Sequence, residues 1–366
     1  MEPCRPDSAC CSDTVTEESL MTSFYLTGSI NVPTTEAAFN LVGKRLQPGV
    51  RRVPDGEPGD RANWVLVHSA RFLSNPTLDV TDGRARVRPG TPVSFGEVDY
   101  HSSALGSYRD FLSARQSGVL APDSRFLVSI ATPFNAVNSF AHFESQVEIA
   151  LAYETALRRS VEKIQSEIPH GDLAIQWDLP TELATLEGWF SNPYGDHEPI
   201  FAATARLADW IADDVDLTFH LCYGDSKFGA SPFMGEPPTK EAAARGGRHI
   251  LPTDASAIVA LSNGLARHIT RPINAIQAAT VAAWTTREHW KPLADLVLEP
   301  ETEFYLGLLH AEDGAEGARR RAAIAAEFLP RFGLSTECGL GRHSTEQLEA
   351  VLVAWQELST TSGPVA

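Results

Sequence analysis

Short apolar runs alternate with longer segments of helical periodicity along most of the chain. The apolar runs predict eight strands, at residues 24–30, 50–56, 125–131, 173–179, 217–224, 273–280, 303–310 and 334–340. Helical spacing of apolar positions predicts helices at residues 140–167, 200–212, 255–268, 314–328 and 345–356. The runs are nearly continuous in apolar residues and do not alternate, which is typical of parallel strands that are covered on both faces.

Eight strand–helix units predict a closed (β/α)₈ barrel, or TIM barrel, as a single α/β domain over residues 22–360. Insertions are expected after strand two (residues 57–124) and after strand five (residues 225–252). An open doubly wound sheet is the alternative, but no G-x-G-x-x-G or Walker sequence supports a nucleotide-binding version of it. The polar, acidic residues 1–21 do not form a secretory signal and are expected to be a disordered tail.

Composition narrows the class of protein. The net charge of −17 argues against a nucleic-acid partner, whose phosphates require a basic face. No apolar run approaches the roughly 20 residues of a membrane helix, so no membrane association is expected. The chain has 5 cysteines, and only Cys222 and Cys338 lie outside the tail. That distribution is no disulfide framework and favours a reducing, cytoplasmic location.

The stretch "DLTFHLCYGD" places His220 and Cys222 two residues apart on a predicted strand. Residues i and i+2 of a strand point to the same face, so the two side chains project together. Cys338 lies near the end of strand eight, at the same mouth of the expected barrel. One nitrogen and two sulfur ligands suit a zinc ion with an open fourth position. Buried Cys and His residues are also common in ordinary cores, and the spacing alone leaves both interpretations open.

Five fragments in chain order resemble the catalytic barrel of cobalamin-independent methionine synthase, within the wider uroporphyrinogen decarboxylase/methionine synthase-like superfamily. The fragments are "TGSINVPTT", "DGE", "IQWDLP", "HLCY" and "TECGLG", and they fall at the tips of successive predicted strands. The resemblance implies a zinc-dependent enzyme that transfers a methyl or other alkyl group to a thiol similar to homocysteine. It implies zinc ligands at His220, Cys222 and Cys338, substrate-binding residues at Ser29, Glu57 and Asp178, and catalytic roles for His310 and Asp178.

The departures from that family pattern limit what the resemblance implies. Strand six, "INAIQAATVAAW", lacks the glutamate that is a further zinc ligand in the family. The site would then be His/Cys/Cys, as in related alkyl transferases that act on other thiols, and Gln277 could instead lie near the metal. Leu179 replaces the glutamate of the family's "DEP" sequence. The additional N-terminal barrel of the long methionine synthases has no counterpart in the sequence, so the alkyl donor is left open.

Two other functions fit the same sequence. A metal-independent lyase or decarboxylase of the same superfamily would use Arg51, Arg52 and Asp178 on an acidic substrate; the sequence "RRVPDGEPGDR" predicts that these arginines lie at the tip of strand two together with Glu57. A degenerate barrel that only binds a metabolite is the second alternative. The expected partners are a small-molecule thiol and an alkyl donor, and nothing in the sequence indicates the oligomeric state.

Overall fold

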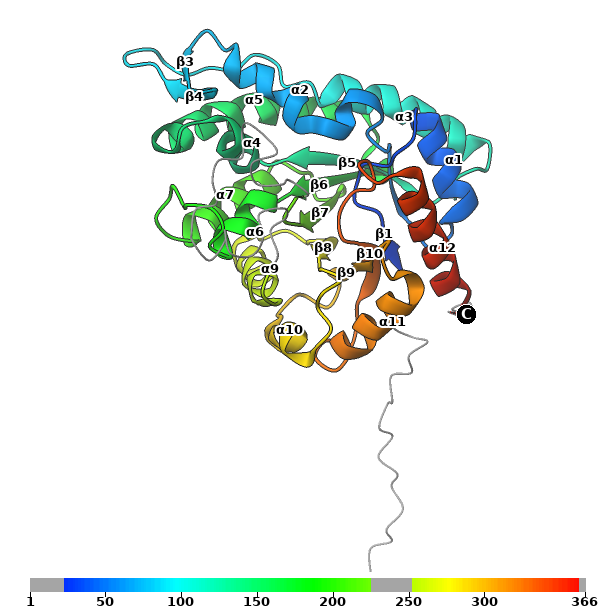
Figure 1. Ribbon diagram of the computed structural model, residues 1–366. Helices are drawn as coiled ribbons and strands as arrows, with labels where there is room; N and C mark the ends of the chain where they lie inside the picture. Colours follow the sequence, from blue (N-terminus) through cyan, green and yellow to red (C-terminus); the bar gives the residue numbers. More distant parts are fainter. Residues whose placement is uncertain (1–22, 225–251, 362–366) are drawn as a thin grey trace, which may run out of the picture.

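The computed structural model describes residues 23–224 and 252–361 (Figure 1). The predicted tail at residues 1–21 lies outside the described residues. So does nearly all of the insertion predicted at residues 225–252. None of the described helices is long and apolar enough to cross a membrane.

Eight parallel strands form a nearly closed barrel, which confirms the predicted fold class (Figure 1). Their order around the barrel is β1-β10-β9-β8-β7-β6-β5-β2. Isolated parallel bridges join Phe24 to Val50 and Ser29 to Gly56, and these bring β1 next to β2. The strands are β1 (Phe24–Tyr25), β2 (Arg52–Pro54), β5 (Arg125–Ala131), β6 (Leu173–Asp178), β7 (Asp216–Leu221), β8 (Ala275–Ala279), β9 (Glu303–Leu309) and β10 (Gly333–Thr336).

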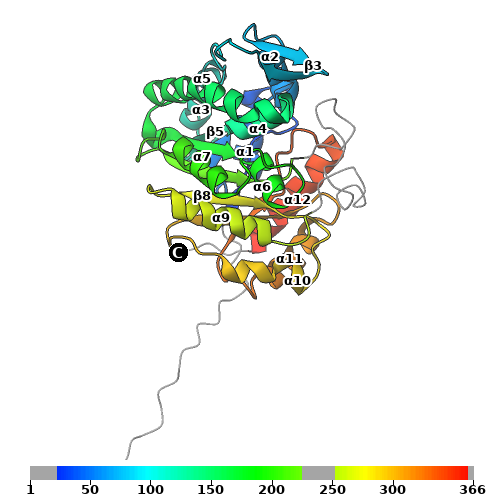
Figure 2. The same ribbon diagram turned by 90° about the vertical axis from the view of Figure 1, so that its left-hand side faces the viewer.

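Helices cover the outer face of the barrel, and α7 and α9 pack side by side there (Figure 2). The predicted helix at residues 140–167 begins later than expected, because Ala141 and His142 are extended and α5 starts at Gln146. The described helices are α1 (Thr35–Arg45), α2 (Trp64–Leu73), α3 (His101–Gln116), α4 (Pro133–Phe140), α5 (Gln146–Glu167), α6 (Pro180–Leu186), α7 (Glu198–Ala208), α9 (Ser256–His268), α10 (Arg287–Trp290), α11 (Gly314–Ala325) and α12 (Thr345–Thr361).

The insertion between β2 and β5 contains α2, a two-stranded hairpin and α3. The hairpin pairs β3 (Leu78–Thr81) with β4 (Arg84–Val87), and the sequence analysis did not predict it. Its two turn residues, Asp82 and Gly83, have φ of 50° and 72°, as a tight hairpin turn requires. Phe72 of α2 packs on the rings of Phe140 and Tyr153, so the insertion is fixed to α4 and α5.

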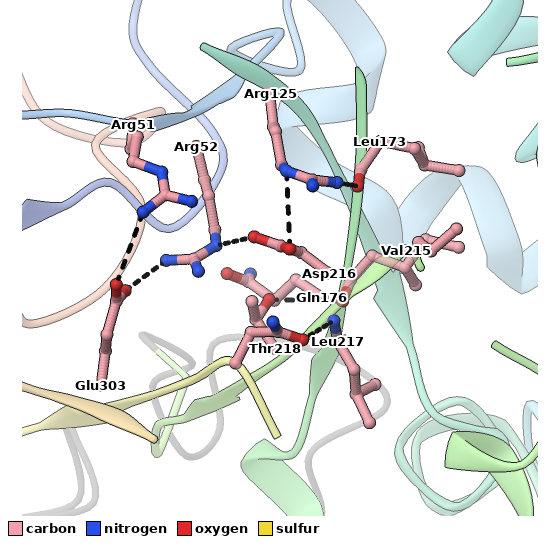
Figure 3. Close-up of polar contacts among 12 residues, drawn as sticks. Arg51, Arg52, Arg125, Leu173, Gln176, Val215, Asp216, Leu217, Thr218 and Glu303 are labelled. Carbon is pink, nitrogen blue, oxygen red and sulfur yellow. Dashed lines mark hydrogen bonds and ion pairs between the residues drawn. The ribbon is translucent and has the colours of Figure 1, made fainter. Parts of the chain in front are cut away.

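Charged side chains close the N-terminal mouth of the barrel (Figure 3). Arg52 Nε donates to Asp216 Oδ2 at 2.8 Å, and Arg52 Nη1 donates to Glu303 Oε2 at 2.6 Å. Arg125 Nε lies 3.5 Å from Asp216 Oδ1. These four residues are the first residues of β2, β7, β9 and β5, so the cluster lies at the end of the barrel where parallel strands begin. We call these four residues the N-terminal ion cluster.

Candidate metal centre

The three predicted metal ligands come together at the C-terminal mouth of the barrel. His220 is the fifth residue of β7, Cys222 follows the end of that strand, and Cys338 follows β10. One ligand atom from each lies within 4.8 Å of the other two. His220 Nε2 and Cys338 Sγ are 3.5 Å apart. His220 and Cys222 are buried, whereas Cys338 is partly exposed.

This donor set fits a zinc ion in kind and in spacing. Zinc–sulfur bonds of about 2.3 Å and zinc–nitrogen bonds of about 2.0–2.1 Å in a tetrahedral site separate neighbouring ligand atoms by roughly 3.5–3.8 Å. The observed separation of 3.5 Å between the His220 nitrogen and the Cys338 sulfur agrees with this value. Two thiolates also favour a soft cation over calcium or magnesium.

Without a cation, Cys338 and His220 both favour their protonated forms. The hydrogen bond to Cys222 and burial raise the pKa of the Cys338 thiol well above its usual range. Burial lowers the pKa of His220, but the adjacent Cys338 sulfur and Asp178 outweigh it and raise that pKa to about 9. A cation bound at these atoms would displace their protons, because thiol and imidazole ligands bind metals in their deprotonated forms.

Glu57 lies beside this centre in an unusual backbone conformation. Its φ is 47°, in the left-handed region, and it directly follows Gly56 with a φ of 79°. Asp55 holds this turn: its carboxylate accepts hydrogen bonds from Glu57 N at 2.8 Å, Arg61 Nη1 at 2.7 Å and Ser107 Oγ at 2.6 Å. Left-handed non-glycine residues cost energy and occur often at functional sites. Asp55 therefore organises the turn that carries Glu57.

The pKa values of the two candidate substrate-binding carboxylates are both raised. Burial, helped by Asp178 and Asp55, raises the pKa of Glu57 to about 8. Burial also raises the pKa of Asp178 to about 6, although His220 and a hydrogen bond from Gln176 oppose the shift. Asp178 ends β6 and is the register partner of His220 on β7, so it adjoins the metal trio. Carboxylates in this state gain from a cationic ligand.

Ser29 stabilises the loop that carries Cys338 through two hydrogen bonds. Its hydroxyl accepts a hydrogen bond from Gly341 N at 3.2 Å, and its backbone oxygen accepts one from Leu340 N at 2.6 Å. A Cβ atom on Gly339 would lie 2.4 Å from Ser29 Oγ, so this close approach requires glycine. The structure therefore gives Ser29 a structural contact that the sequence analysis missed. Its predicted contact with substrate stays a prediction.

His310 follows β9 at the same mouth and is almost fully buried. Its Nδ1 lies 3.4 Å from Oε2 of Glu337, the residue before Cys338. Within the described part of the chain, its Nε2 has no hydrogen-bond partner. Buried ring nitrogens are normally paired, so this nitrogen is available to a ligand. The role of His310 as an acid stays a prediction.

A cavity of about 130 Å³ adjoins Glu57 beneath the β2–β5 insertion. Its walls come from the end of β2, from α2, from the start of α3 and from β5. Asp55 and His68 line it together with Tyr100, Leu127 and Ser129. A cavity of this size admits a small molecule of benzene-like dimensions.

The prediction that Arg51 and Arg52 lie at the tip of strand two is wrong. Arg52 belongs to the N-terminal ion cluster, and the Arg51 guanidinium lies 3.9 Å from Glu303. Arg52 is the first residue of β2, whereas Glu57 follows the C-terminal end of that strand, so the two lie toward opposite mouths of the barrel. Leu179 is fully buried and gives the site no polar contact.

Fold and site together define a (β/α)₈ barrel with a His/Cys/Cys cluster at its C-terminal mouth. Two solved structures are similar in fold. One is a B12-independent methionine synthase from Shewanella sp. W3-18-1 in complex with selenomethionine, with 15% identity, a TM-score of 0.58, and coverage of 93% of this chain and 96% of that chain. The other, from Listeria monocytogenes, is provisionally identified as a vitamin-B12-independent methionine synthase, with 14% identity, a TM-score of 0.53, and coverage of 93% and 98%.

The similarity is one of fold, because both identities are low. No protein-family model matches the chain. No curated protein matches it by sequence either.

Proposed function

We propose that this protein is a zinc-dependent transferase of the methionine synthase-like superfamily that moves a methyl or other alkyl group to a small thiol resembling homocysteine. The convergence of His220, Cys222 and Cys338 within 4.8 Å carries the proposal. The methionine synthases among the structural neighbours support it through their fold. The two carboxylates beside the trio support an acceptor with an amino group.

The protein's own groups have distinct tasks in such a reaction. Zinc held by the trio would supply the Lewis acidity that keeps an acceptor thiol deprotonated at neutral pH. Glu57 and Asp178 would hold the ammonium group of the acceptor by charge-assisted hydrogen bonds. Gln176 Nε2 donates to Asp178 Oδ1 at 2.8 Å and fixes the direction of that carboxylate.

The transfer step balances as a displacement at carbon. The acceptor sulfur forms a bond to the alkyl carbon while the bond between that carbon and the donor atom breaks, and the bonding pair leaves with the donor. The proton lost by the thiol is matched by a proton gained by the donor atom. His310 Nε2, buried and without a partner among the described residues, is the candidate group that delivers it.

The cavity beside Glu57 limits the acceptor to a compact molecule. Its volume of about 130 Å³ accommodates a short carbon chain with polar ends. Polar walls at Asp55 and Ser129 and an apolar wall at Leu127 match such a molecule.

Metal analysis combined with turnover tests the proposal. Purified protein should contain about one zinc per chain, and Cys222→Ser and Cys338→Ser should both lose it. Alkyl transfer to homocysteine from a panel of methyl donors should fall in these variants by at least about a thousandfold. Cys11→Ser, in the N-terminal segment, is the matched control and should keep both metal and turnover.

Two results would contradict the proposal. Metal-free protein with full activity would exclude a zinc-dependent reaction. Turnover of an acidic substrate that survives both cysteine substitutions would favour the metal-independent lyase or decarboxylase.

A further inference from the structure

Gln277 links the two halves of the metal centre through hydrogen bonds that the sequence did not indicate. The fully buried Gln277 lies on β8 as the register partner of His220 on β7. Its Oε1 is hydrogen-bonded to His220 Nδ1, and its Nε2 donates to the backbone oxygen of Thr336 at 2.9 Å. The Thr336 hydroxyl then donates to the backbone oxygen of Cys338 at 2.8 Å.

These contacts determine which nitrogen of His220 can bind a metal. A backbone carbonyl only accepts hydrogen bonds, so the amide NH₂ of Gln277 must face Thr336. The amide oxygen then faces His220 and, as an acceptor, requires a proton on Nδ1. In the neutral ring that binds metals, Nε2 is left as the nitrogen with a free lone pair, and it lies 3.5 Å from Cys338 Sγ. Metal-binding histidines commonly have their second nitrogen fixed in this way.

The same contacts argue against Gln277 as a ligand. If the amide oxygen turned to a cation, the Nδ1–H of the buried His220 would lose its hydrogen-bond partner, and leaving a buried donor unpaired is costly. The NH₂ group would also leave the Thr336 oxygen, which lies inside the barrel wall.

We propose that Gln277 is a positioning residue of the metal centre, outside the coordination sphere, which directs His220 Nε2 at the cation and couples β7 to the loop that carries Cys338. This inference rests on the proposed zinc site. It deepens that proposal by explaining why the metal would have three protein ligands. The Gln277 amide is already engaged with His220 and Thr336 and is not free to bind the cation.

Cobalt substitution tests the role through metal affinity and spectrum, without a turnover assay. Gln277→Met removes both hydrogen bonds at nearly constant volume and should weaken Co²⁺ binding about 10- to 100-fold. Gln277→Glu keeps an acceptor for Nδ1–H and should stay within about threefold of the wild-type affinity, with the same visible absorption spectrum. Gln146→Met, at a buried glutamine of α5, is the matched control and should leave both unchanged.

A proton NMR measurement separates this inference from the zinc proposal. The His220 Nδ1–H resonance should be protected from solvent exchange in wild type and Gln277→Glu, and exchange faster in Gln277→Met. If wild type binds no metal but shows this protection, the zinc proposal fails while the positioning contact stands. Unchanged Co²⁺ affinity in Gln277→Met overturns the inference. So does tighter binding with an added oxygen ligand in Gln277→Glu, because the position would then be a ligand position.

Discussion

The two mouths of the barrel bury charged groups in opposite ways. At the N-terminal mouth, Arg52 and Asp216 are both buried, and Arg52 has carboxylate partners at 2.8 and 2.6 Å (Figure 3). At the C-terminal mouth, Glu57 and Asp178 form no ion pair within the described residues, and the pKa of each is raised. Paired charges stabilise a closed end, while unpaired carboxylates are available to a ligand. TIM-barrel enzymes divide stability and activity between their two ends in the same way.

Removal of the central arginine of the N-terminal ion cluster should have the largest effect on stability. Arg52→Leu leaves the carboxylates of Asp216 and Glu303 without their main partner and should lower the free energy of unfolding by about 3–5 kcal/mol. Urea denaturation measures this loss. Arg51→Leu, at a half-exposed side chain with a 3.9 Å contact, should change it by less than about 0.5 kcal/mol. Zinc content should be normal in both, and a loss of metal in Arg52→Leu would show that the mouths are not independent.

At the other mouth, neutralising a carboxylate should improve stability and harm binding. An unfolded glutamate has a pKa near 4.3, whereas that of Glu57 is about 8, so the folded state favours the protonated form. The stability that this preference gives is complete below about pH 4 and is lost as the pH rises through 8. At pH 9, the free energy of unfolding of Glu57→Gln should therefore be about 1–2 kcal/mol higher than that of wild type. This value is discounted because the Glu57 side chain is partly exposed.

The same variant should bind an amino-group-bearing acceptor about 10- to 100-fold more weakly at pH 8. Wild-type affinity should increase from pH 6 to pH 8 as Glu57 ionises. The negative charges of Asp178 and Asp55 oppose this ionisation, and the positive charges of Arg61 and Arg342 favour it. Calorimetric titration across this range measures both effects. A flat pH profile in wild type, or a Glu57→Gln variant that binds normally, would remove Glu57 from the acceptor site.

The smallest loss at the C-terminal mouth is expected at Ser29, where one side-chain hydrogen bond supports the Cys338 loop. Ser29→Ala removes the acceptor of Gly341 N–H and should cost about 0.5–1.5 kcal/mol in unfolding free energy. Zinc affinity should fall only a few-fold, as measured by competition with a chelator. A loss as large as that of Cys338→Ser would mean that Ser29 does more than hold the loop.

Much of the fold could be predicted because it depends on local periodicity, whereas the metal trio needed the family resemblance beside the spacing of its residues. The i, i+2 spacing of His220 and Cys222 sets a common face, and the position of Cys338 after a strand places it at the same end. Positions within a short strand were harder to predict. Arg52 begins β2 and lies at the N-terminal mouth. The strand predicted over residues 50–56 does not show at which mouth of the barrel Arg52 lies.

Contacts between distant segments could not be predicted from one sequence. The glutamine that fixes His220 lies 57 residues away, and its partner Thr336 lies 59 residues further on. The hairpin in the β2–β5 insertion was also missed, although "TDGR" carries the Asp-Gly pair that its turn requires. In that case the signal was present in the sequence.

The seam between β1 and β2 has a consequence for motion. Among the described residues, backbone hydrogen bonds span it from Phe24 N to Gly49 O and from Ile30 N to Gly56 O, whereas β5 and β6 are joined by a continuous ladder. Thinly bonded segments open at lower free energy than the rest of a domain. Deuterium should therefore replace the amide proton of Ile30 earlier than those in the middle of β6. Each such opening would disturb Ser29, which accepts hydrogen bonds from Leu340 N and Gly341 N, and with it the loop that carries Cys338.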